Sequence, residues 1–283
     1  MYGPPPVFSM LTATLSDVSS PRGRVLRYAA DIRPVSMVAA SFVLHLGVFW
    51  YASTTFALLA MLPLVALSTM VAAFNHHHQH INAFRSPFLN RVYDLVLAVQ
   101  TGVGPYTWVL HHNLGHHKNY LNQPPHAEPD ESHWTRKDGS TMGRIEYTLH
   151  TFLHHQVDVY RVGQRHPDVF RRYLLMKIPC YAFVALGFYL NPLNYLIVFF
   201  VPALLALMHT CWATYEHHAG VAASEHVEAS VNRENALFNL LTCNLGLHTA
   251  HHMYPGRHWS ELPQLHAQIR HQIPEAQLLQ AFW

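Results

Sequence analysis

The chain contains four long apolar runs that are almost free of charged residues and that occur as two pairs. They cover residues 36–52, 55–74, 173–190 and 192–215. Each run is close to the roughly 17–25 residues that a helix needs to cross a bilayer. Very few residues separate the two runs of a pair, and Asn191-Pro192 is a turn signal. The pattern predicts an all-α membrane protein with four transmembrane helices in two hairpins.

A further apolar stretch, residues 93–110, is interrupted by Gly102, Gly104 and Pro105. We expect a half-buried or re-entrant segment there. The alternative is a fifth span, which would put the two histidine-rich halves of the chain on opposite sides of the membrane.

The composition agrees with a membrane protein. Of 283 residues, 50% are hydrophobic and 12% are charged, whereas soluble domains carry about 25% charged residues. We expect one main domain at 36–270, preceded by an N-terminal segment at 1–35 and followed by a tail at 271–283. The formal net charge of +2 is too near balance to indicate a nucleic-acid partner.

The distribution of Lys and Arg indicates the orientation. These residues precede the first run, fill the segment between the pairs and follow the last run, whereas the two tight turns contain none. Because cytoplasmic loops are enriched in Lys and Arg, we expect a multi-pass protein with both termini and the middle segment on the cytoplasmic side. Lys177, near the entry of the third run, is expected to snorkel toward water.

Histidine is the most unusual part of the composition, with 25 residues against 18 Lys plus Arg. Residues three or four apart share one face of a helix, and neutral imidazole is the commonest metal ligand. Nine imidazoles are too many for one ion, so we expect two ions. The expected ligands are His76, His80, His112, His116, His117, His217, His248, His251 and His252.

Other histidines fit structural roles better. The neighbours of the expected ligands, His77, His78, His111 and His218, are expected to face elsewhere. His150 and His154-His155 repeat the spacing of the second cluster. They lie in a charge-rich amphipathic segment, which we interpret as an interfacial helix without metal ligands.

The order of the clusters resembles a known family. The motifs H-x3-H, H-x3-HH and H-x2-HH, with apolar runs around them, resemble those of the membrane fatty acid desaturase superfamily, which also holds fatty-acid, sterol-type and alkane hydroxylases. The segment from Asn244 to Pro255 is similar to the third histidine box of that superfamily and the residues after it. Tyr215-Glu216-His217 resembles an element that adds a ligand between the second and third boxes. The resemblance covers about residues 36–270.

The resemblance implies four transmembrane helices capped by a cytoplasmic helical domain that holds a di-iron site. It also implies O2 as a reactant and a lipid or fatty acid as substrate. The chain contains no recognisable electron-transfer domain, so we expect an external donor such as ferredoxin or rubredoxin with its reductase. The first box, His76 to His80, lacks the acidic or Asn residue often found inside it.

This chemistry requires a metal, because side-chain acids and bases cannot break an unactivated C–H bond and a cofactor must supply the oxidant. Imidazole suits iron. We expect desaturation of a fatty-acyl or fatty-acid chain, and hydroxylation or oxidative decarboxylation to a terminal alkene stay open as alternatives. A zinc-binding membrane protein or metal transporter is the rival class, although a transporter would place its ligands at mid-membrane depth.

Residues around the metal ligands are predicted less directly. Acids and amides orient metal-bound imidazoles through their free ring N–H. The candidates for this role are Glu216, Asp130 and Asn244, with Glu234 and Asp94 as further acids. The candidates for lining a substrate cavity are Trp108, His209, Trp212 and Phe238.

Overall fold

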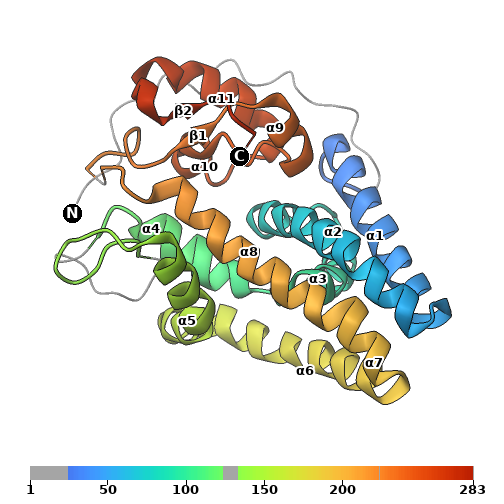
Figure 1. The fold of residues 1–283 in the computed structure, drawn as a ribbon. Coiled ribbons are helices and arrows are strands. Elements are labelled where there is room, and N and C mark those ends of the chain that lie inside the picture. Colours follow the sequence, from blue (N-terminus) through green and yellow to red (C-terminus); the bar gives the residue numbers. More distant parts are fainter. Residues whose placement is uncertain (1–24, 124–132, 223, 283) are drawn as a thin grey trace.

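The computed structural model of the protein describes residues 25–123, 133–222 and 224–282 (Figure 1). Four helices in this part of the chain are long and apolar enough to cross a membrane. The first two are α1 (Ile32–Tyr51) and α2 (Thr54–His80), and the third is α6 (Pro167–Leu190). The fourth is continuous through α7 (Pro192–Tyr195), the π-helical turn η4 (Leu196–Phe200) and α8 (Val201–His218). The four expected apolar runs coincide with these helices, except that Ala52 at the end of the first run lies just beyond α1.

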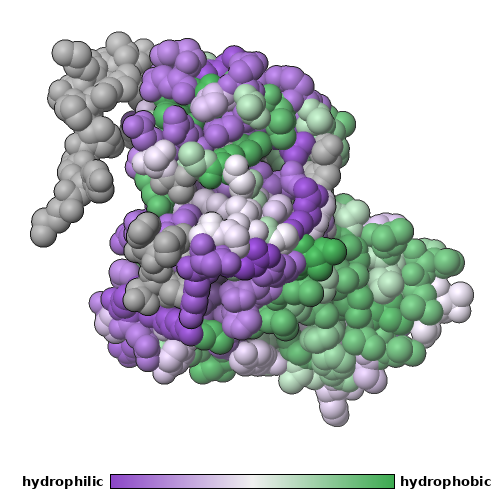
Figure 2. All heavy atoms as spheres, turned by 60° about the vertical axis from the view of Figure 1, so that its left-hand side comes forward, coloured by the Kyte–Doolittle hydropathy of each residue, from purple (hydrophilic) through white to green (hydrophobic). Residues whose placement is uncertain are grey.

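The surfaces of these helices are apolar on the outside of the molecule. Figure 2 shows hydrophobic side chains gathered over one part of the surface and hydrophilic side chains over the rest. Leu59 and Leu62 of α2 are 73% and 75% exposed, and Ile178 of α6 is 66% exposed. A soluble monomer rarely exposes a large contiguous apolar surface, so this surface is suited to contact with lipid.

In each pair, a polar side chain in the turn caps the start of the second helix. Ser53 accepts a hydrogen bond from the Phe56 N–H at the start of α2, and Asn191 accepts one from the Asn194 N–H at the start of α7. The Asn194 side chain donates to the carbonyl oxygens of Phe49 and Ala52, both at 3.1 Å. These bonds connect the turn after α1 to the start of the fourth span.

The interrupted apolar stretch turns back inside the bundle. Helix α3 (Pro87–Thr101) ends at Gly102, whose φ of +70° is left-handed. A Cβ at this glycine would lie 2.8 Å from the carbonyl oxygen of Ala203. The chain then continues into the π-helix η3 (Val109–His116) and α4 (His117–Asn119). The return brings the first two histidine clusters to the same end of the bundle, which excludes the alternative that separates them.

Helix α5 (Arg144–Arg165) carries the repeated histidine spacing and is amphipathic. One face packs on α8 and η3 through buried residues such as Tyr147 and Val159. The opposite face exposes apolar side chains, with Leu153 68% exposed. This two-sided pattern is that of a helix lying at a membrane interface.

The residues after α8 form a compact unit, here called the C-terminal unit. It contains α9 (Ala236–Thr242), α10 (His248–Met253) and α11 (Leu262–Ile269), with short 3-10 turns at Trp259–Glu261, Arg270–Gln272 and Glu275–Gln277. Strand β1 (Asn232–Arg233) pairs in parallel with β2 (Leu278–Leu279). Ile273 and Leu278 are buried in the core of the unit, so residues expected to form a tail are part of it.

The C-terminal unit is attached to the start of α1, just after the 3-10 turn at Ala29–Asp31. The Asp31 carboxylate accepts a hydrogen bond from Trp259 Nε1 and lies 3.0 Å from His258 Nε2. The Arg33 guanidinium lies 3.2 Å from Cys243 Sγ and over the Trp259 ring. These contacts fix the unit against the end of the bundle where α2 terminates.

Gly246 allows the close approach that builds this unit. Its carbonyl accepts a hydrogen bond from the Arg233 N–H at 2.7 Å, and a Cβ at Gly246 would lie 2.3 Å from the Arg233 carbonyl oxygen.

Gly246→Ala is therefore expected to lower the free energy of unfolding by about 1–3 kcal/mol or more, measured by thermal unfolding in detergent. The control is Gly256→Ala, because nothing lies within 4 Å of a Cβ there. Equal melting temperatures for the two variants would refute this role of Gly246.

Candidate metal centre

The first histidine cluster lies on the last turns of α2. His76 and His80 are four residues apart and project from the same face of the helix. Nδ1 of His80 lies 3.1 Å from the Pro255 carbonyl oxygen. A ring N–H on Nδ1 donates to this oxygen, so Nε2 keeps its lone pair, and Nε2 has no hydrogen-bond partner among the described residues.

The second cluster lies on a π-helix, where the wider turn changes which residues share a face. The His117 N–H bonds to the His112 carbonyl, five residues earlier. His112, His116 and His117 therefore project together, although they are four and five residues apart. π-helical turns are rare and frequently occur at functional sites.

The third cluster lies on α10, a helix of six residues that other parts of the C-terminal unit hold in place. The side chain of Asn232 accepts from the Thr249 N–H at 3.0 Å and donates to the Thr249 hydroxyl at 2.7 Å. With α10 fixed in this way, His248, His251 and His252 face the bundle and are all buried.

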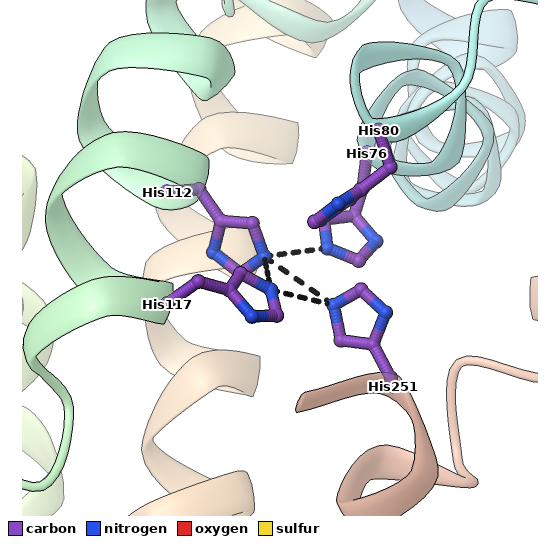
Figure 3. Close-up of side chains that lie close together, drawn as sticks. All are labelled: His76, His80, His112, His117 and His251. Atoms are coloured by element: carbon purple, nitrogen blue, oxygen red, sulfur yellow. Dashed lines mark hydrogen bonds between the residues drawn. The ribbon is translucent and has the colours of Figure 1, made fainter. Parts of the chain in front are cut away.

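Five imidazoles from three separate segments of the chain form the first group (Figure 3). Their members are His76, His80, His112, His117 and His251. One nitrogen from each ring lies within 4.8 Å of the others. The Nε2 atoms of His76 and His112 are 2.7 Å apart, and those of His117 and His251 are 2.9 Å apart.

A second group lies next to the first. His116, His218 and His252 bring their ring nitrogens together, and all three are buried. His248 belongs beside them, because its Nε2 lies 3.1 Å from Nε2 of both His218 and His252. The ring of His252 also stacks on His117, with centroids 4.2 Å apart, so the two groups are in contact.

The end of α8 differs from the sequence-based expectation. His218, which we expected to face elsewhere, points into the second group, whereas His217 is in neither group. Adjacent residues on a helix point about 100° apart, so only one of the two can reach the group. His217 instead stacks on His248 with ring centroids 3.9 Å apart. The available signal was weak: His218 lies seven residues after buried Cys211, on the same face of the helix.

Two aromatic rings that the sequence analysis did not predict cover the second group. Trp134 stacks on His218 with ring centroids 5.2 Å apart, and Tyr120 lies 4.2 Å from His252. Both rings are almost fully buried, and the Tyr120 hydroxyl pairs with Nδ1 of His226. They exclude water from one side of the group.

The imidazoles outside the spans are held uncharged. Burial, followed by the repulsion of neighbouring imidazoles, holds the pKa values of His112, His116 and His248 well below their usual range. His251 and His252 are shifted in the same direction for the same reasons. Neutral rings have a lone pair, which is the form that binds a metal.

The geometry fits metal ions. Imidazole nitrogens bound to one ion at about 2.1 Å are roughly 3–4 Å apart. The nitrogens in the two groups lie around this spacing, from 2.7 Å between His76 and His112 up to a limit of 4.8 Å. His218 has its other nitrogen fixed, because Nδ1 lies 2.8 Å from the Ala229 carbonyl oxygen. Such a hydrogen bond sets the tautomer and orients the ring of a ligand.

The expected supporting residues lie in other places. Glu216 pairs with Arg144 and Arg233. Asn244 has a left-handed φ of +65° and donates to the Trp259 carbonyl, so it shapes the turn before α10. Asp130 lies outside the described residues.

Buried polar side chains connect the first two clusters, and Asp94, one of the further acids expected to support the ligands, is among them. The Asp94 carboxylate accepts from Gln79 Nε2 at 2.6 Å and lies 3.3 Å from His78 Nε2. The Gln79 carbonyl accepts from the Asn113 side chain at 2.9 Å. Gln79 therefore ties α2 to both α3 and η3, a role that its position between two histidines did not reveal.

The repeated spacing on α5 stays apart from both groups. His150 and His154 stack on one another with centroids 4.4 Å apart. Nδ1 of His155 lies 2.7 Å from the Phe152 carbonyl oxygen. Among the described residues, none of these three histidines belongs to a group that could hold a metal ion.

A cavity of about 740 Å³ ends at the histidines. It lies between α2, α8 and α9, and most of its walls are apolar. Trp108, His209, Trp212 and Phe238, the residues expected to line a substrate cavity, all border it. His76 and His112 of the first group border it as well.

Four helices that can span a membrane, with two histidine groups at one end that could hold metal ions, indicate the class of integral-membrane proteins with a histidine metal site. The fatty acid desaturase family model matches residues 49–282. The chain therefore belongs to the fatty acid desaturase family, whose membership implies an oxidoreductase. Searches of curated proteins and of solved structures gave no match.

The difference between His217 and His218 gives a direct test. If the second group binds an ion, His218→Ala is expected to reduce bound iron from two ions per chain toward one, whereas His217→Ala retains both. Metal analysis of the purified protein, together with thermal unfolding to control for misfolding, measures this. The reverse order of iron loss would contradict the position of His218.

Glu234 gives a second test, of stability rather than of metal binding. Its pKa is lowered to about 2, mainly by the hydrogen bond from Arg270 and further by that from His266. A lowered carboxyl pKa stabilises the fold above the ordinary carboxyl range near pH 4–5, and this contribution is lost as the pH falls toward 2.

Glu234→Gln is therefore expected to lower the melting temperature at pH 7, with a difference from wild type that shrinks toward pH 3. Scanning calorimetry in detergent at several pH values measures it. Glu225→Gln, at an exposed position, is the matched control. A melting-temperature difference independent of pH would exclude the ion pair as its cause.

Proposed function

We propose that the protein is an O2-dependent oxidoreductase that removes hydrogen from an unactivated C–H bond of a fatty-acyl or fatty-acid chain, with desaturation as the reaction. One observation carries this proposal: nine imidazoles from four separate segments converge in two adjoining groups. Membership of the fatty acid desaturase family supports the same chemistry.

The two groups would each hold one iron ion. The first ion would bind to members of the five-histidine group, and the second to His116, His218, His248 and His252. When bound, the iron pair activates O2 and supplies the oxidant for the C–H bond. The protein contributes neutral ligands, rings fixed by hydrogen bonds from His80 and His218, and aromatic walls that exclude water.

The proposed desaturation balances in atoms and electrons. Two adjacent methylenes lose one hydrogen each and gain a second bond between their carbons. O2 is reduced to two waters, which requires two further electrons and two protons. We propose that an external reduced iron–sulfur or rubredoxin-like protein supplies these electrons.

The 740 Å³ cavity is suited to the acyl chain. Burial of methylenes against its apolar walls stabilises the bound chain by about 0.8 kcal/mol per CH2 relative to water. Trp108 touches both His76 and His112, with ring centroids 5.4 and 5.3 Å away. A chain in the cavity would therefore pass Trp108 beside the first group.

The orientation proposed from Lys and Arg puts the histidine groups on the cytoplasmic side. Both groups lie where α2 and α8 end, at the same end of the bundle. A cytoplasmic electron donor would then reach them without crossing the membrane. A metal transporter would need ligands along a path through the membrane, and these groups are gathered at one end.

Expression in a host that lacks this activity, followed by mass spectrometry of lipids, free acids and hydrocarbons, tests the proposed function. Wild type is expected to produce chains two mass units lighter in the presence of O2. His112→Ala and His251→Ala are expected to abolish product and iron loading, because each removes a nitrogen from the centre of the first group.

His154→Ala is the matched control, since this histidine lies on α5 away from both groups, and it should spare product and iron. Hydroxylated chains or terminal alkenes would identify a different outcome of the same oxidation. One zinc ion per chain without O2 consumption would refute the proposed function.

A further inference from the structure

A separate cavity of about 410 Å³ lies between α3, α6 and α8. Most of its lining is apolar, and the backbone of Gly102 and Gly104 forms part of one wall. Its polar side consists of Gln156 from α5 with Tyr173, Lys177 and Tyr181 from α6. We call it the Lys177 cavity.

Lys177 has only neutral partners in the described structure. Its ammonium donates to Gln156 Oε1 at 3.2 Å and to the Tyr181 hydroxyl at 3.4 Å. It also lies 4.7 Å from the centre of the Tyr173 ring. Gln156 Oε1 already accepts from the Tyr173 hydroxyl at 2.6 Å. The described residues place no carboxylate within ion-pair distance, so the cavity has an uncompensated positive charge at its mouth.

The position of Lys177 along α6 places its charge inside the third span. Lys177 is five residues beyond Arg172, which puts it about 8 Å further along α6. Ionisable residues within spans are rare and mark binding sites or ion pathways. Tyr181 is 62% exposed on the lipid-facing surface, so an amphiphile could reach the ammonium from the bilayer.

The Lys177 cavity leads toward the histidines. Thr107 and Leu207 border both this cavity and a narrow one of about 60 Å³, which His112 and His116 also line. Trp108 and His217 then border both the narrow cavity and the 740 Å³ cavity. The three spaces therefore follow one another, and the histidine groups lie beside the middle of the series.

We propose that Lys177 binds the carboxylate of an unesterified fatty acid whose chain follows these three spaces past the histidine groups. This inference rests on the proposed function and names its substrate class. The ammonium supplies a charge-assisted hydrogen bond, the Tyr181 hydroxyl is placed to supply a second donor, and the apolar walls bury the methylenes.

The anchor also determines where the chain is oxidised. With its carboxylate at Lys177, the acid presents an interior methylene to the histidines and keeps its carboxyl carbon away from them. The double bond then forms between two interior carbons, by the balance given above, and the carboxyl group stays in the product.

Equilibrium binding to the purified full-length protein in detergent tests the anchor without requiring turnover. The probes are radiolabelled hexadecanoic acid and its methyl ester. Lys177→Gln is expected to raise the Kd for the acid about tenfold or more and to leave the Kd for the ester within about twofold. Lys177→Arg should retain most of the acid affinity, and Tyr181→Phe should weaken acid binding alone by a smaller factor.

Arg172→Gln, which removes a charge from the same helix outside the cavity, is the matched control and should change neither Kd. An unchanged acid Kd in Lys177→Gln, or equal losses for acid and ester, would overturn the inference. Release of the carboxyl carbon as CO2 during turnover would overturn it too. Acid binding that depends on Lys177 in a protein without oxidase activity would instead refute the proposed function alone.

Discussion

The structure depends on burying clustered histidine side chains while their imidazole rings stay unprotonated. Lipid cannot satisfy a free backbone group, so the spans must be helices, and helices that end at a common level bring their last turns together. His76 and His80 on α2 and His218 on α8 meet there because of this constraint. A protonated ring in such a place would repel its neighbours and lose its hydration. The imidazoles outside the spans are shifted accordingly toward the neutral form.

A framework of amides surrounds the rings and determines their directions. Gln79 connects α2 to α3 and η3, while Asn232 fixes α10 through Thr249. Amides suit this task because they donate and accept without adding charge beside the groups. Carboxylates such as Asp94 and Glu216 lie further out, where arginines pair with them. The carboxylates and their arginine partners thus surround the two histidine groups and do not belong to them.

The sequence predicted the features of the fold and site that follow from helical periodicity and from composition. Apolar runs located the spans, and histidine spacing located the boxes, because both follow from helix geometry. It could not decide between His217 and His218, since the rotation of α8 is set by packing against α2 and α5. It carried no signal for the π-turn that aligns His112 with His117, or for Trp134 and Tyr120, whose contacts join segments far apart in the chain.

The parallel pairing of β1 with β2 has a consequence for the order of assembly. Residues up to 218 carry six of the nine grouped histidines, and the remaining three lie on α10. The segment before α10 is joined to residues 278–279, which the ribosome makes later still. The two histidine groups can therefore be completed only after residues 248–279 have been synthesised, well after the four spans.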